Sequence, residues 1–201
     1  MSQYLVFQLH GPMASWGVDA PGEVRHSHEL PSRSALLGLL AAALGIRREE
    51  LQDPELLSAL ISRRDYYTDA WWMIAVAVTP DAPYSLEQLH EALRYPVFPL
   101  YLGRKSHPLA LPLMPLLLEG HAAEVLRQAY RQYQERFNLL RLSLRQLQDQ
   151  CWWEGEHAGL VANKILRRRD CPLNRQHWLF GERSMNQGTW LSKEETCTSQ
   201  E

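Results

Sequence analysis

The order of its apolar segments predicts that this chain is an α+β protein, with a ferredoxin-like (RRM-like) antiparallel sheet that carries two helices. Three observations support this fold class. Residues 1–118 alternate between strand-like runs and helical segments, residues 121–148 have the periodicity of one long helix, and the rest returns to short strand-like runs. We therefore expect two domains: a ferredoxin-like domain at residues 1–118, and a region at residues 119–201 that combines a helical insert with a small C-terminal β region.

Strands are expected where apolar side chains follow one another without interruption. Residues 4–9 (YLVFQL) predict a buried strand that passes into a long loop at residues 10–31. Residues 71–79 (WWMIAVAVT) are the strongest strand candidate and end before Pro80. Further strands are expected at residues 96–103, 151–153 and 160–166, with residues 167–170 ending the last one and the final twenty residues frayed or peripheral.

The expected helices are marked by the residues at their ends. Ser32 precedes a run of small and apolar residues that stops at Gly45, where a glycine commonly terminates a helix. Ser85 is followed three residues later by Gln88, which is the signature of a capping box. Helices are therefore expected at residues 32–46, 48–62 and 85–93.

A longer helix is expected at residues 121–148, with apolar residues on one face and arginines on the other. The plain interpretation is an amphipathic surface helix with a solvated arginine face. The alternative is a helix that docks on nucleic acid or on a partner protein, so its role stays open. The arginines are Arg127, Arg131, Arg136, Arg141 and Arg145.

The composition argues against several classes of protein. The 201 residues have a net charge of −2, which does not suit a free-standing nucleic-acid binder but does suit a subunit that grips nucleic acid over a small area. The three cysteines lack CxxC spacing, so a disulfide framework or a zinc site is not expected. No run approaches the roughly 18 apolar residues of a membrane span. We expect a cytoplasmic protein with no metal, no cofactor and no membrane contact.

A loop bounded by glycines follows the first strand and forms one side of an expected anion site. Its glycines let the backbone approach a ligand closely, and its tryptophan is suited to stacking on a base. The alternative is a tight turn with the tryptophan buried as core. The candidate binding residues of this loop are Gly11, Pro12, Met13, Ser15 and Trp16.

The start of the helix at residues 32–46 forms the other side of that site. A helix N-terminus offers unpaired amides and a partial positive charge, to which Ser32, Arg33 and Ser34 add donors. Ser32 and Ser34 are also explained as helix caps. Arg33 is the strongest single candidate, because a cation at a helix N-terminus opposes the helix dipole unless an anion lies there.

Two further segments offer cations beside aromatic or hydroxyl groups. Arg64 and Tyr66 could contact phosphate and stack on a base, although Arg64 and Asp65 also suit a surface ion pair of little energetic value. A second glycine turn carries two cations and two more donors, and a solvated turn is the alternative there. That turn consists of Gly103, Arg104, Lys105, Ser106 and His107. The open face of a ferredoxin-like sheet is the usual RNA platform of such folds.

Taken together, five blocks in this order resemble the CasD family of subunits of type I-E CRISPR surveillance complexes (Cascade), within the repeat-associated mysterious protein (RAMP) superfamily. The resemblance spans most of the chain, and its five ordered blocks are more specific together than any one of them. The blocks are residues 9–17 (LHGPMASWG), 31–45 (PSRSALLGLLAAALG), 64–68 (RDYYT), 101–109 (YLGRKSHPL) and, more loosely, 168–180 (RRDCPLNRQHWLF).

The resemblance implies a RAMP fold and a non-catalytic, RNA-binding role. It implies one copy per complex, which holds the 5′ handle of the CRISPR RNA and contacts the neighbouring backbone RAMP subunit and the large subunit. Target DNA would be contacted only indirectly. The sequence departs from the family between Thr68 and Trp71, where a few tens of residues that form much of the β-hairpin thumb are nearly absent.

Two other functions remain as alternatives. Lys105 and His107 could cleave repeat RNA without a metal, as type I-C relatives do, although no tyrosine can be assigned to such a site. The chain could instead be a purely architectural subunit whose arginines contact protein. His26 and His28 have a spacing that a metal could use, but no third ligand stands out.

Overall fold

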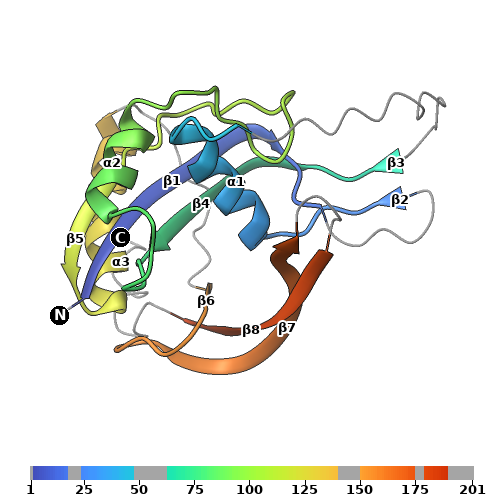
Figure 1. The fold of residues 1–201 in the computed structure, drawn as a ribbon. Helices are drawn as coiled ribbons and strands as arrows, with labels where there is room; N and C mark the ends of the chain where they lie inside the picture. Colours follow the sequence, from blue (N-terminus) through green and yellow to red (C-terminus); the bar gives the residue numbers. More distant parts are fainter. Residues whose placement is uncertain (1, 18–23, 48–62, 140–149, 175–178, 190–201) are drawn as a thin grey trace, which may run out of the picture.

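A computed structural model describes residues 2–17, 24–47, 63–139, 150–174 and 179–189 of the chain. Its main sheet has three antiparallel strands in the order β4-β1-β5 (Figure 1). Strand β1 (Ser2–Ala14) lies in the centre, between β4 (Tyr67–Val76) and β5 (Leu116–Gly120). The central place of β1 follows from its sequence, because residues 4–9 are buried on both faces.

Helices α1 (Arg33–Ala43) and α2 (Leu86–Arg94) cover one face of this sheet (Figure 1). Both helices agree with the sequence-based expectation. Gly45 has a φ of +77° just beyond α1, and Ser85 and Gln88 make the reciprocal bonds of a capping box at the start of α2. The two helices enclose the Leu5, Phe7 and Leu9 side chains of β1 in the larger core.

Helix α3 (Ala122–Leu139) covers the opposite face, so the expectation of an open RNA platform on the sheet is wrong. Val125, Ala129, Tyr133 and Phe137 of α3 are at most 4% exposed and pack with Tyr4 and Val6 of β1. The sequence pattern predicted this helix and its apolar stripe. It did not show that the stripe would lie on the sheet rather than elsewhere.

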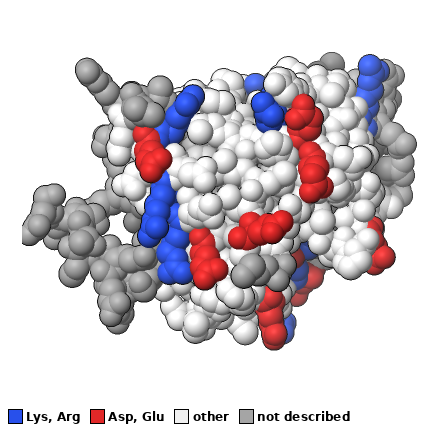
Figure 2. Space-filling model, turned by 90° about the vertical axis from the view of Figure 1, so that its left-hand side faces the viewer, with Lys and Arg blue, Asp and Glu red and all other residues white. Residues whose placement is uncertain are grey.

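The described part of α3 has the solvated outer face of an amphipathic surface helix. Arg131 and Arg136 are exposed, and Glu124 and Glu135 lie among them in sequence and are also exposed. Figure 2 views the molecule from the side where β5, α2 and α3 lie and shows basic and acidic side chains interspersed on a largely uncharged surface. Residues 140–148 of the expected helix, with Arg141 and Arg145, lie outside the described residues, and a docking role for the helix stays a prediction.

A second antiparallel sheet, in the order β6-β8-β7, arcs beneath α1 in Figure 1. It consists of β6 (Gln150–Trp153), β7 (Val161–Asn174) and β8 (Leu179–Thr189). The expected strand at 151–153 is confirmed. Two other expectations were wrong: β7 continues past residue 170 to Asn174, and residues 182–189 of the segment expected to be frayed belong to β8, which pairs with both neighbours. Residues 190–201 lie outside the described residues. Residues 167–170 of β7 are all charged and β8 is mostly polar, so both give little strand signal, and cross-strand pairing supplies the stability instead.

The strand expected at residues 96–103 does not form, apart from an isolated bridge between Tyr101 and Pro108. Prolines at 96, 99, 108, 112 and 115 remove backbone donors along this stretch, which disfavours a paired strand. The third strand of the sheet is β5, which begins directly after the last of these prolines. β5 spans the boundary expected between residues 118 and 119, and the division into two domains stays a prediction.

The structure is thus a mixed α/β protein with antiparallel sheets, and the ferredoxin-like arrangement itself stays a prediction.

A short parallel pair, β2 (Val24–Arg25) and β3 (Arg63–Arg64), projects from the side of the molecule (Figure 1). The helix expected at residues 48–62 lies outside the described residues. β4 runs through residues 68–71, the place where the sequence nearly lacks the thumb segment of the resembled family. Asp69 in this stretch has a φ of +49°. None of the described helices is long and apolar enough to cross a membrane.

The Tyr133 hydroxyl ties α3 to the sheet and gives a test of this packing. It donates toward the carbonyl oxygens of Val6 and Met114, at 3.1 and 3.0 Å, and burial raises the pKa of its phenol. We expect Tyr133→Phe to lower the free energy of unfolding by about 1 kcal/mol, because buried carbonyls lose a donor. Urea unfolding measures this, with the exposed Tyr95→Phe as the control. Equal stability of the two variants would contradict the prediction.

Candidate nucleic-acid interface

The second glycine turn is a compact loop held by its own backbone. The Leu102 amide donates to the His107 carbonyl at 2.8 Å, and the His107 amide donates to the Arg104 carbonyl at 2.9 Å. Gly103 has a φ of +84°, a conformation that side chains disfavour. The turn leaves Lys105 and Ser106 exposed at its tip.

This turn is seated on the glycine loop at the end of β1, so the structure brings two of the predicted segments together. The Ser15 amide donates to the Leu102 carbonyl at 3.1 Å. A Cβ on Gly103 would lie 1.8 Å from the Ser15 carbonyl oxygen, and one on Gly11 would lie 2.6 Å from Leu102 Cδ1. Both glycines are therefore required by close packing between the two segments.

Tyr66 lies against the same turn and remains 38% exposed. Its ring meets the His107 ring edge-on with 5.1 Å between centroids, and the Arg104 guanidinium carbon lies 6.0 Å from the Tyr66 centroid. We call Tyr66, Arg104, Lys105 and Ser106 the Tyr66 surface. Pro12 and Met13 are exposed on the adjoining end of β1, and Arg64 occupies β3 just before Tyr66, its side chain being outside the described residues.

Trp16 is buried in the core, so its ring is not exposed for stacking on a base. The side chain is 2% exposed and meets Trp72 edge-on at 5.3 Å between ring centroids. The backbone amide of Trp16 donates to the Ser27 hydroxyl oxygen at 2.9 Å, and the backbone carbonyl of Trp16 accepts from the His28 amide at 2.8 Å. The alternative interpretation, a tight turn with a core tryptophan, is the one observed.

The start of α1 already holds an anion, and that anion belongs to the chain itself. The Arg33 amide donates to Asp170 Oδ2 at 3.0 Å. Ser32 caps the helix by accepting from the Ala35 amide, and its hydroxyl lies 3.0 Å from that of Ser34. Both serines thus have the capping and local bonding roles that the sequence left open.

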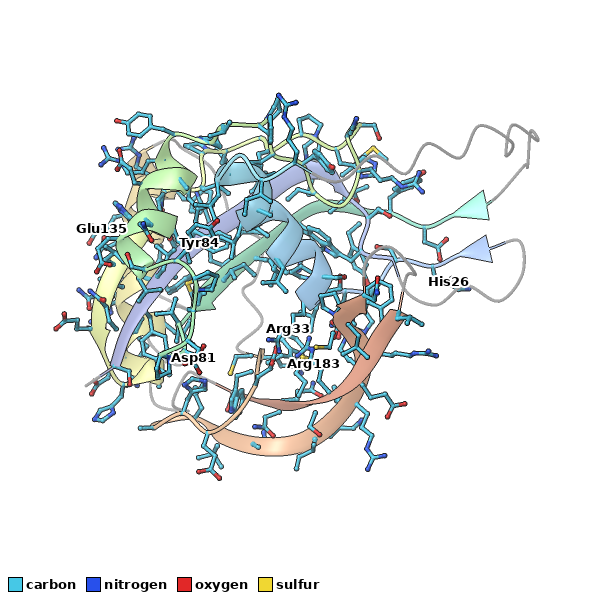
Figure 3. The ribbon with its side chains drawn as sticks, viewed as in Figure 1. His26, Arg33, Asp81, Tyr84, Glu135 and Arg183 are labelled. Atoms are coloured by element: carbon cyan, nitrogen blue, oxygen red, sulfur yellow. The ribbon has the colours of Figure 1, made fainter. Side chains whose placement is uncertain are left out.

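Arg33 also has a protein partner, so it is not a free phosphate ligand here. Its side chain pairs with Glu154 at 2.5 Å, and Arg183 bonds both Glu154 and Asp170, at 2.9 Å and 2.5 Å (Figure 3). Arg168 Nε lies 3.6 Å from Asp170. We call Arg33, Glu154, Arg168, Asp170 and Arg183 the Asp170 cluster.

The electrostatics of the Asp170 cluster favour the paired, charged state. Burial alone would raise the pKa of Asp170, but hydrogen bonds from Arg183 and from the Arg33 amide outweigh it and lower that pKa. Burial lowers the pKa of Arg168, against the attraction of Asp170, and Glu29 lies close enough to act in the same sense as Asp170. The three arginines are thus matched by three carboxylates, which leaves no surplus charge for a phosphate.

Sequence reasoning missed Glu154, Asp170 and Arg183. One signal was available: Asp170 is the only acidic residue among residues 161–174, directly after three arginines. Alternation along a strand places Arg168 and Asp170 on one face, while Arg167 and Arg169 point to the other. The observed burial follows this alternation.

His26 and His28 have hydrogen-bond partners, whereas the buried Nδ1 of His107 has none among the described residues. His107 is 3% exposed. His26 Nδ1 lies 2.6 Å from Asp65 Oδ2, and His28 Nδ1 accepts from the Leu30 amide at 3.2 Å. Within the part of the chain that the structure describes, no group of three or more His, Cys, Asp or Glu residues is placed to hold a metal.

A comparison with known protein families matches residues 4–61 and 52–186 to the CRISPR-associated protein family Cas5. The chain belongs to the Cas5 family. Among curated Cas5 relatives, the CRISPR system Cascade subunit CasD of Escherichia coli (strain K12) is 30% identical over 157 residues, covering 56% of this chain and 70% of that protein.

Solved structures agree with the Cas5 assignment. One named "Crystal structure of Cas protein" is 27% identical with a TM-score of 0.59, covering 93% of this chain and 94% of its own. A chain of a "CRISPR RNA-guided surveillance complex" has a TM-score of 0.57 over 92% of this chain and 89% of its own. At 19% identity, this second likeness shows a shared fold.

Removing the Asp170 charge tests the role of the Asp170 cluster in this Cas5 fold. We expect Asp170→Asn to lower the free energy of unfolding by roughly 3 kcal/mol at pH 7, because Arg183 and Arg168 are left without their partner. The folded state lowers the pKa of Asp170, so its contribution is complete above the unfolded pKa near 3.9 and is lost as the pH falls through the folded value.

Urea unfolding of both proteins across pH 3–7 measures this effect, and the difference between them should shrink at the acidic end. The control is Asp65→Asn, which breaks the exposed pair with His26 and should change stability by less than about 0.5 kcal/mol. A pH-independent difference between the natural chain and Asp170→Asn would show that charge is not the cause.

Proposed function

We propose that this chain is a non-catalytic, RNA-binding subunit of a type I-E CRISPR surveillance complex (Cascade) that holds the 5′ handle of the CRISPR RNA. Membership of the Cas5 family and the likeness to a Cascade subunit support this proposal. The Tyr66 surface is the part of the chain that we assign to the RNA. Its partners would be the CRISPR RNA, the backbone RAMP subunit and the large subunit.

The observation that carries the proposal is the exposed Tyr66 ring with Arg104 above it. A base can stack on an exposed aromatic face whatever its identity, and such a contact is worth about 1–3 kcal/mol. The guanidinium of Arg104 can reach a phosphate in the same nucleotide, and Lys105 and Ser106 add a further cation and donor at the tip of the turn.

The proposal places RNA at loop ends rather than on a sheet face, because helices cover both faces of the main sheet. Gly11 and Gly103 support this location by fixing the turn against β1, which holds Arg104 beside Tyr66 without a flexible linker. A small contact area also suits a net charge of −2. Affinity would then depend on other subunits that hold the rest of the guide.

Cleavage of RNA by Lys105 and His107 is the weaker alternative. A general base must come within hydrogen-bond reach of the 2′-hydroxyl that it deprotonates. His107 is 3% exposed, with its ring against Tyr66, so a substrate would have to displace Tyr66 to reach it. We therefore favour retention of RNA without cleavage.

The cleavage alternative has a direct test. We expect labelled repeat RNA to stay intact on a denaturing gel after incubation with the purified chain, alone or with its co-expressed neighbours. The matched variants are Lys105→Ala, at an exposed position, and His107→Ala. Cleavage by the natural chain that both variants abolish would make the chain a processing nuclease.

Two pairs of variants test the RNA assignment. One pair changes the Tyr66 surface, and the control pair changes a similar cation–aromatic contact elsewhere in the chain. Arg94 and Tyr95 form a second cation–aromatic contact, 5.3 Å from guanidinium carbon to centroid, on the exposed end of α2. We expect Tyr66→Ala to weaken handle binding by about tenfold and Arg104→Glu to reduce the salt slope of binding by at least 0.7, whereas Tyr95→Ala and Arg94→Glu change neither.

Filter binding of the assembled complex with handle RNA at several salt concentrations measures both quantities. An unchanged slope and affinity in both site variants would favour the purely architectural alternative, in which the other subunits alone hold the RNA. Equal losses in the site and control variants would show that general surface charge, rather than the Tyr66 surface, is responsible.

A further inference from the structure

Strand β7 forms the outer edge of the C-terminal sheet. Its 14 residues (Val161–Asn174) pair with β8 on one side, and among the described residues no strand pairs on the other side. An edge strand presents a row of backbone donors and acceptors that can pair with another strand. Proteins usually shorten, charge or bulge such an edge. β7 is long, its surface charge is of one sign, and its register is regular from Lys164 to Arg169 between two of its three irregularities.

The exposed side chains of β7 are apolar and basic. Val161 is 74% exposed, Ile165 is 68% exposed and Leu173 is 70% exposed, which makes them some of the most exposed large hydrophobic residues described. Lys164 and Arg167 are exposed cations of the same strand. The single carboxylate of β7, Asp170, is turned inward to the Asp170 cluster, so it does not offset them.

The positive charge of Arg169 is compensated within the sheet, unlike the charges of Lys164 and Arg167. Its Nε donates to the Phe180 carbonyl at 3.1 Å, and Glu182 of β8 lies opposite it in the sheet. The partner of Arg167 across the sheet is the uncharged Ser184, and that of Lys164 is Gln187. The uncompensated positive charge therefore lies in the first half of the strand, beside Val161 and Ile165.

We propose that the edge of β7 docks an acidic β-strand of a neighbouring protein subunit, which adds to the sheet as a fourth strand. This inference rests on the proposed function, since it takes the chain to be one subunit of an assembly. Backbone pairing supplies the contact along the edge, and alternate side chains supply the specificity. Carboxylates of the added strand meet Lys164 and Arg167, and its apolar residues cover Val161 and Ile165.

RNA and a second copy of this chain fit the same edge less well. RNA offers no amide ladder to pair with β7, and it stacks on aromatic or guanidinium planes rather than on branched aliphatic side chains. Two copies of β7 would bring two basic strands side by side, which like-charge repulsion disfavours. The outer edge of β7 combines unpaired backbone donors and acceptors with exposed aliphatic residues and uncompensated cations. This combination favours an acidic protein strand.

Hydrogen exchange locates the contact directly. The amides of residues 161–167 are compared between the free chain and the assembled complex that contains its co-expressed neighbouring subunits and CRISPR RNA. We expect the outward-facing amides among them to exchange at least tenfold more slowly in the complex, while the amides of Leu5 and Val6 in β1, which pair with a strand on each side, are unchanged. Equal exchange of residues 161–167 in the two samples would overturn the proposal.

Variants separate this proposal from the RNA assignment. Ile165→Lys and the double variant Lys164→Glu with Arg167→Glu should reduce the protein subunits recovered with the chain by about tenfold, while the complex that still assembles binds handle RNA with unchanged affinity. Val97→Lys is the control, because Val97 is 64% exposed and lies outside β7. Full recovery of the neighbours by both β7 variants would overturn the docking proposal and leave the Tyr66 surface untouched. Lost handle binding in the Tyr66 and Arg104 variants, with normal subunit recovery, would support both assignments.

Discussion

The carboxylate of Asp170 is the interaction on which the arrangement of this chain depends. It accepts from the first amide of α1 and from Arg183, and so it joins the N-terminal and C-terminal parts of the chain across 137 residues of sequence. A helix N-terminus attracts an anion because its amides are unpaired and its dipole is positive. Here the sheet that packs beneath the helix supplies that anion. The orientation of the second sheet is therefore set by a short, directional contact as well as by apolar packing.

This internal use of the helix N-terminus decides where a polyanionic ligand can bind. Arg33, Arg168 and Arg183 are balanced by Asp170, Glu154 and the nearby Glu29, so a phosphate at that place would have to displace a buried carboxylate. Such a displacement would leave an unpaired buried charge. The cations of the glycine turn have no comparable carboxylate partner among the described contacts, and Tyr66 lies beside them. The two groups of cations therefore have different partners, although the sequence alone presents them in the same way.

The sequence predicted those features whose signals are local. The capping box of Ser85 and Gln88, the stop at Gly45 and the apolar runs of β1 and β4 each act within a few residues, and the structure contains all of them. It could not predict the partner of Arg33, because that partner lies 121 residues away. The sequence also left the position of α3 open, because an apolar stripe shows that one helix face is buried but does not show which part of the chain covers it. For the candidate site, the structure brings the glycine turn and Tyr66 together, which the sequence had offered only as separate segments, whereas Trp16 and the start of α1 are parts of the core and of the Asp170 cluster.

Covering both faces of the main sheet has a further consequence for how a protein of this size can serve several partners. With α1 and α2 on one face and α3 on the other, the faces of the main sheet are covered, whereas the ends of its strands and the edge of the second sheet are exposed among the described residues. These two surfaces differ in chemistry. The Tyr66 surface combines an aromatic ring with cations, which suits bases and phosphates, while the β7 edge combines aliphatic side chains with cations and an open backbone ladder, which suits a protein strand. Because different residues form each surface, the two proposed ligands, RNA and a protein strand, would not compete for the same contacts on this chain.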